Sequence, residues 1–325
     1  APEEQKARQK RLAEWSQQLD SLEKQLKSKP RHLDAFFKTL DDLDTAFLQD
    51  SSAGEKCVER SAALRFDAAT LKDGEFSFYK LPLKQSGAVV ELFYDFSKPE
   101  QFTAWTLDNP DNSGSADYDA KSAAVILRAS GKRNWDKRDR RNTPLLRLPF
   151  YFQRDNWAFA ARANLQSDTN QKNKPDYGIL IWDGAGGSIR LSIKDATPKD
   201  VVVMLNGSTP KEENIAPKPL YLSGRPRDSI HLQMTCVNGL IACVATSPSG
   251  KIITLNGGKE PIGFEPRFAG LFVRTHEDGE QAAVQFDSVK LLALPNREKL
   301  KEIQESTRKE ALLKARMDFA KNRAK

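Results

Sequence analysis

Phe268-Ala-Gly-Leu-Phe-Val-Arg-Thr-His276 and Gln281-Ala-Ala-Val-Gln-Phe-Asp-Ser-Val-Lys-Leu-Leu292 decide the fold of this chain, because apolar side chains alternate along both stretches. The short polar segment Glu277-Asp-Gly-Glu280 lies between them. Alternation with a period of two places successive side chains on opposite faces of a β-strand, so one face of each stretch is apolar. The pair therefore predicts the closing antiparallel hairpin of a β-sandwich.

The same period extends over the chain between about Cys57 and Pro295. Its short alternating runs are separated by Gly, Pro, Asn and Asp, as expected of an antiparallel all-β domain. Besides the closing pair, the pattern predicts strands at residues 75–80, 88–96, 123–128, 145–152, 157–164, 177–183, 188–194, 201–205, 229–237, 240–246 and 251–255. The fold class is therefore mainly β, with residues 51–295 predicted to form one sandwich.

Two further stretches carry a resemblance to a known family. Tyr177-Gly-Ile-Leu-Ile-Trp-Asp183 is a strand that opens on Gly and closes on Asp, and residues 93–105 run from an aromatic strand through a polar turn to Trp105. With the closing pair, they make residues 58–295 resemble the concanavalin A-like lectin/glucanase superfamily, which includes laminin G-like sandwiches. The resemblance implies an antiparallel two-sheet jelly roll. It also makes Asp287 similar to a final-strand acid that can help hold a structural calcium, although one Asp falls far short of the roughly 6 to 8 oxygens of a calcium shell. No other cofactor is expected.

Residues 1–50 have a helical period instead. Apolar side chains recur alternately three and four residues apart, at Leu12, Trp15, Leu19, Leu22 and Leu26, and again at Leu33, Phe36, Leu40, Leu43 and Phe47. The interruption at Pro30 predicts two helices, a hairpin or angled pair, each with one apolar stripe that must pack on the other helix, on the sandwich or on another chain. The partner-binding candidates are Leu12, Trp15, Leu19, Leu22, Leu26, Phe36, Leu40 and Phe47.

Residues 296–325 are again helical in pattern, rich in Lys, Glu, Arg and Ala and free of Gly and Pro. They predict a charged C-terminal helix with a broken apolar stripe. Such a helix either docks on its own domain or contacts a protein partner or a second copy of the chain.

The chain has 51 Lys and Arg against 44 Asp and Glu, a net charge of +7. Part of this excess lies in residues 132–141, a basic run that contains Trp135. Such a run grips an acidic sugar or phosphate by charge and stacking, or is a solvated loop. No nucleic-acid-reading motif accompanies it, so nucleic-acid binding is not expected.

No apolar run approaches the roughly 20 residues that span a bilayer, so no transmembrane segment is expected. The chain begins Ala1-Pro-Glu-Glu without Met. A mature chain looks like this after signal-peptide removal, and so does a trimmed one. We expect an exported protein, either periplasmic, at the cell surface or secreted.

Cys57, Cys236 and Cys243 cannot all pair within one chain. Asn238-Gly239 favours a two-residue turn that places Cys236 opposite Ile241 and Cys243 one diagonal step away. Diagonal neighbours lie about 7 Å apart, beyond comfortable disulfide reach. Buried free thiols are expected, and only a longer turn would allow a bridge.

Residues that would carry catalysis are not found at the required spacing. Glucan-cleaving members of the superfamily place acids on alternate residues of one strand, and no such array occurs here. The acidic cluster Glu277-Asp-Gly-Glu280 is expected to be exposed and unpaired in its turn. His32, His231 and His276 lie far apart, without a nucleophile-elbow, phosphate-loop or metalloprotease motif. The sequence predicts a protein that is not an enzyme.

Strand parity points to a binding surface instead. Polar side chains that oppose the apolar face of their strands, together with two tryptophans suited to stacking on sugars, give the ligand-binding candidates Trp135, Arg147, Tyr151, Arg162, Trp182, His231, Gln233, Arg274 and His276. If these sets fall on one sheet, its open face suits the hydroxyls and acidic groups of a glycan. The alternative is the ordinary solvated face of a sandwich.

The first hypothesis is therefore a non-catalytic exported sandwich that binds an acidic or neutral polysaccharide or glycoconjugate, with helical ends for protein attachment. The second is a structural subunit of an extracytoplasmic assembly that binds no sugar. The third is an unusual glycoside hydrolase or lyase, which the missing acid array disfavours.

Overall fold

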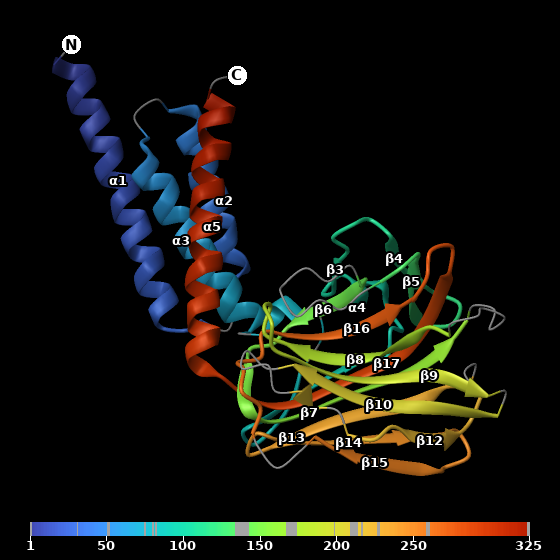
Figure 1. Cartoon of the computed structure of the whole chain (residues 1–325). Coiled ribbons are helices and arrows are strands. Elements are labelled where there is room, and N and C mark those ends of the chain that lie inside the picture. The colour runs from blue at the N-terminus through green and yellow to red at the C-terminus, as the bar shows by residue number, and fades with distance from the viewer. Residues whose placement is uncertain are drawn as a thin grey trace. The chain divides into compact units, whose positions relative to one another are not determined.

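The computed structural model of the chain describes residues 2–30, 32–50, 53–74, 76–79, 81, 83–133, 143–166, 174–197, 199–208, 214–215, 217–225, 228–257 and 261–323. It divides into two compact units (Figure 1). The helical unit comprises Ala1–Ser77 and Glu298–Lys325, and the β unit comprises Phe78–Arg297.

The described part of the helical unit contains α1 (Pro2–Lys27), α2 (Asp34–Gln49), α3 (Glu55–Asp73) and all but the first residue of α5 (Arg297–Arg323). The predicted helices at both ends of the chain are thus confirmed. The break between the first two also lies where expected, because Lys29 has a left-handed backbone (φ 51°) and Pro30 lacks the amide hydrogen that a continuing helix needs.

The apolar stripes of α1 and α2 are covered by helices of the same unit. One buried cluster joins Leu19, Leu22, Leu33, Phe36, Leu40, Leu43 and Phe47 to Val58, Leu64 and Ala68 of α3 and Phe319 of α5, with Trp15 and Leu26 packed against it. Most of the predicted partner-binding residues therefore form the core of the helical unit. They are not a free surface for another chain.

The helix α3 corrects the prediction that the sandwich starts near residue 51. Its buried positions are Val58, Ser61, Leu64 and Ala68, so the inward stripe includes two small side chains, one of them polar. The Ser61 hydroxyl donates to Asp44 of α2 at 2.6 Å. Because this stripe contains few large apolar residues, its helical period is weak in the sequence.

The β unit consists of two antiparallel sheets, as predicted (Figure 1). Sheet A has the order β1 (Lys84–Ser86), β2 (Val89–Tyr94), β17 (Gln281–Pro295), β7 (Phe152–Leu165), β13 (Ile230–Val237), β14 (Leu240–Thr246) and β15 (Ile252–Asn256), with β5 (Ala124–Ser130) also on β17 and β4 (Gly114–Asp119) on β5. Sheet B has the order β11 (Asn214–Ile215), β10 (Asp200–Ser208), β9 (Ser188–Thr197), β8 (Asp176–Trp182), β16 (Phe268–Arg274), β6 (Leu145–Pro149) and β3 (Thr106–Asp108), with β12 (Leu220–Ser223) also on β10. The short helices η1 (Ser77–Tyr79) and α4 (Pro99–Phe102) complete the described elements.

The core of the sandwich lies between the sheets and follows the predicted alternation. Along β13, Ile230, Leu232, Met234 and Cys236 are buried while the residues between them are partly exposed. In β8 every residue is buried, so the outer face of sheet B is also covered at this strand.

The closing strands correct one prediction. Residues 268–274 and 281–295 are both strands, but β16 belongs to sheet B and β17 to sheet A, so they do not form a hairpin with each other. The alternation specifies a strand with one inward face, and both sheets of a sandwich offer such a face. The segment between β16 and β17 is thus a connection from one sheet to the other.

None of the helices in the described part of the chain combines the length and the apolar character that crossing a bilayer demands.

We predict that Leu40→Ala destabilises the helical unit by about 2–5 kcal/mol, because Leu40 is fully buried and its truncation leaves a cavity. Urea unfolding followed by circular dichroism at 222 nm measures the change. The matched control is Leu71→Ala on α3, whose side chain is 39% exposed, with an expected change within about 0.5 kcal/mol. Equal effects of the two substitutions would contradict the assignment of Leu40 to the core.

Candidate functional site

The polar side chains selected by strand parity are divided between the outer faces of the two sheets. Sheet A carries Arg162, His231 and Gln233, whereas sheet B carries Arg147, Trp182 and Arg274, with His276 just beyond the end of β16. The chain changes sheets between Pro149, where β6 ends, and Phe152, where β7 begins. These side chains therefore do not share one sheet face. Trp135 lies outside the described residues.

Tyr151 lies at this change of sheet. Its ring centroid is 6.4 Å from that of Tyr79, and its carbonyl accepts a hydrogen bond from the Asn296 amide at 3.1 Å. Burial raises the pKa of the Tyr151 hydroxyl. The structure thus places Tyr151 in packing around the crossover, away from both groups of polar candidates.

The outer face of sheet A contains a hollow of about 380 Å³, here named the sheet A pocket. Its lining includes Phe93, Asp95, Arg162, His231, Asp287 and Lys290 around Ala160. In the strand register, Lys290 lies between Phe93 and Ala160, and Arg162 lies between Ser288 and His231. The hollow follows from this register, because Ala160 contributes only a methyl group among long side chains.

A β-bulge in β17 shapes the floor of the sheet A pocket. The register of β17 against β7 shifts between Phe286 and Ser288, at Asp287. At the same point β17 changes its other partner, from β5 up to Phe286 to β2 from Val289 onward. Bulges are common where a sheet re-aims a side chain next to a functional site.

The Asp287 carboxylate keeps most of its capacity to accept hydrogen bonds. Its recorded donors are the hydroxyls of Ser229 and Ser288, each at 3.3 Å. Among the described residues, no group of three or more His, Cys, Asp or Glu side chains could hold a metal ion. Calcium at Asp287 stays a prediction.

The pocket contains both hydrogen-bond donors and hydrogen-bond acceptors. Burial, together with the charge of Arg162, lowers the pKa of His231, so at neutral pH this ring offers one donor and one acceptor. The Lys290 ammonium lies 3.1 Å from the Glu91 carboxylate on the neighbouring strand. The Phe93 ring is 45% exposed and gives the pocket an apolar wall.

Asp95, the second carboxylate of the pocket, is held in its ionised form. It accepts hydrogen bonds from the hydroxyl and amide of Ser97 at 2.7 and 3.0 Å and from the Gln101 side chain at 2.9 Å. These bonds lower the pKa of Asp95. It therefore serves as an acceptor at neutral pH.

The polar candidates on sheet B are arranged around a buried acid, Asp176. Its carboxylate, only 4% exposed, accepts two hydrogen bonds of 2.7 Å from the Arg274 guanidinium, and Nε2 of His276 lies 3.3 Å from it. Burial alone would raise the pKa of Asp176, but the neighbouring His276 ring and the charge of Arg274 outweigh it and lower the pKa. Arg274 and His276 therefore belong to a charge network with Asp176. The sequence did not reveal this network, because Asp176 lies 98 residues before Arg274.

Two more arginines occupy the same face. Arg190 lies opposite Leu180 in the register of β8 and β9, and burial together with the charge of Arg274 lowers its pKa to about 10. Arg190 therefore keeps its charge at neutral pH. The Arg147 guanidinium lies 4.1 Å from the centroid of the Phe268 ring, in cation–π geometry.

Trp182 packs in this cluster and is not an open stacking platform. Its ring is 5% exposed and lies 5.3 Å from the Phe268 ring, and its indole nitrogen donates to the Ala185 carbonyl at 2.9 Å. With Leu145, Leu180 and Phe272 it forms a buried cluster on sheet B.

The prediction that the acidic turn after β16 is exposed and unpaired is correct for the exposure of Glu277 and Asp278 but wrong for Glu280. Glu280 is buried, and its carboxylate accepts hydrogen bonds from the amides of His276 and Glu277, both at 2.9 Å. Asp278 accepts from the Lys132 amide at 3.3 Å. Through these hydrogen bonds, the carboxylates of Glu280 and Asp278 stabilise the conformation of the connection between the sheets.

The cysteine prediction is confirmed. In the register of β13 and β14, Cys236 lies opposite Ile241 and Cys243 lies opposite Met234. Both thiols are free and buried. Burial raises the pKa of Cys236 to about 12 and also raises that of Cys243, so neither is a reactive thiolate.

Comparison with known proteins finds likeness only among solved structures. No family model matches the chain, and no curated protein matches it. The GH43 protein BlXynB from Bacillus licheniformis is 14% identical with a TM-score of 0.47, and the match covers 65% of this chain and 40% of that one. This chain therefore spans less than half the length of that protein.

Two further solved structures are similar over nearly their whole length. Peanut lectin is 9% identical with a TM-score of 0.42, covering 63% of this chain and 97% of that one. A glycoside hydrolase family 16 endo-glucanase from Bacteroides ovatus is 11% identical with a TM-score of 0.40, covering 62% and 99%. The likeness to these three structures is partial and concerns the fold alone.

We predict that Asp176→Asn destabilises the β unit by about 3 kcal/mol at pH 7, because it leaves the partly buried charge of Arg274 without its carboxylate. The lowered pKa of Asp176 means that its contribution is complete above the ordinary carboxyl pKa of about 4 and is lost as the pH falls through the lower folded value. The difference between the two proteins should therefore shrink below about pH 4. Urea unfolding over a pH series measures it.

The control is Asp117→Asn, which removes an exposed ion pair with Arg128 on the same unit. Its expected effect is at most about 1 kcal/mol. A difference between wild type and Asp176→Asn that stays constant down to the acid limit of folding would show that the charge of Asp176 is not what stabilises this face.

Proposed function

We propose that this chain is a non-catalytic binding protein whose sheet A pocket holds part of a polysaccharide or glycoconjugate. The observation that carries the proposal is the composition of the pocket. One hollow combines an exposed aromatic ring, two aspartate side chains and guanidinium and imidazole donors. This set matches the surface of a sugar, which has apolar C–H faces and a rim of hydroxyls that both donate and accept.

Each wall of the pocket has a role in this proposal. Phe93 packs against the face of a sugar ring, Asp287 accepts from its hydroxyls, and Arg162 donates to its oxygens. Ala160 provides the space that the ring occupies. The size of the hollow is that of an ordinary small-ligand site.

The charges of the pocket favour a neutral glycan over a strongly acidic one. Lys290 is paired with Glu91, Arg162 shares the pocket with the carboxylates of Asp95 and Asp287, and His231 is neutral at pH 7. A polyanion would meet both carboxylates as well as the cations. Neutral hydroxyls use both kinds of group.

The state of the carboxylates favours binding over hydrolysis. A glycosidase needs one carboxyl group whose pKa is raised so that it donates a proton to the leaving oxygen. In the sheet A pocket the pKa of Asp95 is lowered by its hydrogen bonds. We therefore propose a role without bond cleavage.

We include export in the proposal, since extracytoplasmic glycans are the ligands available to a protein of this kind. The buried thiols are compatible with it. Cys236 and Cys243 have raised pKa values, so they resist oxidation without needing a bridge.

We predict that Phe93→Ala and Arg162→Ala each weaken glycan binding roughly fivefold to tenfold while leaving the melting temperature nearly unchanged, because both side chains are exposed. A panel of neutral and acidic soluble polysaccharides selects the ligand, and titration calorimetry measures the dissociation constants. Tyr221→Ala, which removes a 67% exposed aromatic ring from β12 of sheet B, is the matched control with unchanged affinity. Binding that survives both pocket substitutions would overturn the assignment of the pocket.

A further inference from the structure

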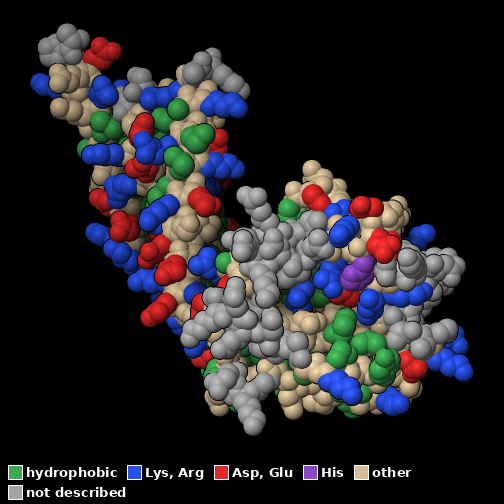
Figure 2. Space-filling model, in the orientation of Figure 1, with side chains coloured by type: hydrophobic (Ala, Val, Ile, Leu, Met, Phe, Trp, Pro, Cys, Tyr) green, Lys and Arg blue, Asp and Glu red, His purple; other side chains and the backbone are tan. Residues whose placement is uncertain are grey.

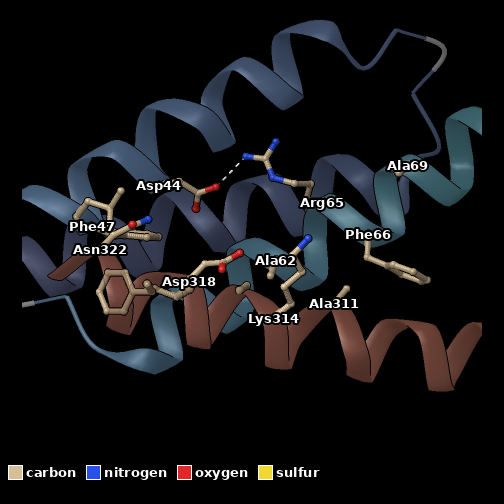
Figure 3. A pocket seen from close by; sticks show the side chains of 14 residues that line it. Asp44, Phe47, Ala62, Arg65, Phe66, Ala69, Ala311, Lys314, Asp318 and Asn322 are labelled. Carbon is tan, nitrogen blue, oxygen red and sulfur yellow. Dashed lines mark hydrogen bonds and ion pairs between the residues drawn. The ribbon is translucent and has the colours of Figure 1, made fainter. Parts of the chain in front are cut away.

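The helical unit contains an apolar groove of about 430 Å³ between α2, α3 and α5 (Figure 3). Phe47 and Leu48 line it from α2, Ala62 and Phe66 from α3, and Ala315 from α5. The small side chains of Ala62, Ala311 and Ala315 leave this space between the helices unfilled.

The helix α5 is held to the unit from its other side, mainly by arginines. Arg308 makes two hydrogen bonds to Asp67, Arg316 pairs with Glu55 and Glu59, and Arg323 donates to the carbonyls of Asp50 and Ala53. From this part of α5 only Phe319 is buried in the apolar cluster of the unit, with Ala315 packed against it. These contacts anchor α5 without involving its opposite face.

That opposite face exposes a stripe of two large apolar residues. Leu313 is 57% exposed and Met317 is 64% exposed, and they lie one helical turn apart. Figure 2 shows hydrophobic side chains at the surface along α5 between Lys, Arg, Asp and Glu. The exposure of this apolar pair to water is unfavourable, so the pair suits a contact with another protein surface.

Charged side chains flank the stripe at the same spacing. Lys314 and Asp318 project from α5 toward the groove and are again one turn apart (Figure 3). Glu310 and Lys321 continue this edge and are exposed. Within the described part of the chain, no ion pair is recorded for any of these four side chains.

The sequence of this face is complementary to itself in the antiparallel direction. A two-fold axis beside Ala315 and Arg316 brings each residue of one α5 opposite a residue of the other. An axis at the midpoint of Ala315 and Arg316 places Glu310 opposite Lys321 of the second copy, and it places Leu313 and Lys314 within one residue, about 1.5 Å along the helix, of positions opposite Met317 and Asp318. Long side chains span this offset, so one axis serves the apolar pair and both charge pairs, as an isologous interface requires.

We propose that the occupant of this face is a second copy of the chain, whose α5 lies antiparallel along the first and covers the mouth of the groove. The apolar pairs supply the attraction and the reciprocal charges set the direction and the register. The contact is small, so the dimer is weak and depends on concentration.

Charge reversal tests the arrangement on the full-length chain. Lys314→Glu alone places two carboxylates opposite each other twice in the dimer, and Asp318→Lys alone does the same with two ammonium groups. Each substitution should weaken self-association by about tenfold or more. Light scattering on a sizing column over a concentration series measures the native mass, which should move from twice 36.5 kDa toward 36.5 kDa.

Two restorations separate this register from a general effect of charge. The double variant Lys314→Glu with Asp318→Lys recreates both pairs with their signs exchanged and should again form dimers. An equimolar mixture of the two single variants should also associate, because each supplies the charge that the other lacks. Circular dichroism checks that every variant keeps its helices.

Three outcomes would overturn the proposal. The first is a wild-type chain that stays monomeric at every concentration. The second is a dimer whose mass does not respond to the single reversals, since its interface then lies elsewhere. The third is a mixture of the single variants that stays monomeric although wild type associates, since the charges are then not reciprocal.

Discussion

The hydrogen bonding of β17 is the constraint on which the β unit depends. This strand pairs with β7 on one side, and on the other side with β5 along its first part and β2 along its second. Two partners fit on one edge only because β17 is 15 residues long. The change of partner occurs at Asp287, where the register also shifts, so the strand that joins three others also creates the irregular point at which the sheet A pocket forms.

Local pattern was enough to predict the class of fold and most of its strands. The Asn238-Gly239 turn specified the pairing of β13 with β14, because a two-residue turn fixes both partners and register. Residues 275–280 contain no such turn motif. They form a longer connection from one sheet to the other, in which the Glu280 carboxylate accepts hydrogen bonds from the amides of His276 and Glu277. The helix α3 was missed for a related reason, since Ser61 and Ala68 take core positions that a larger apolar residue would have marked.

Side-chain parity predicted part of the site, because it assigns each residue to a face but not to a sheet. Arg162 and His231 do line the sheet A pocket, and Asp287 lines it with them. Phe93 and Lys290 were within reach of the same reasoning, since both oppose the buried residues of their strands. The partnership of Asp176 with Arg274 was not, because it depends on β8 and β16 being neighbours, which only the folded topology supplies.

The two proposals support each other through the arithmetic of weak binding. An open pocket on a sheet face, with one aromatic wall and a few hydrogen-bonding groups, holds a single sugar weakly, since the solvated hydroxyls gain little by exchanging water for protein. A dimer formed through α5 would carry two such pockets, and a polysaccharide repeats its sugar many times. When one pocket has bound, the second meets its ligand at a high effective concentration, so the polymer is retained more strongly than any fragment that fills one pocket. The helical unit and the β unit would then act together in binding. A second copy of the chain raises the overall affinity of a shallow pocket for a polymer, and a weak dimer is stabilised whenever both of its pockets bind the same polymer.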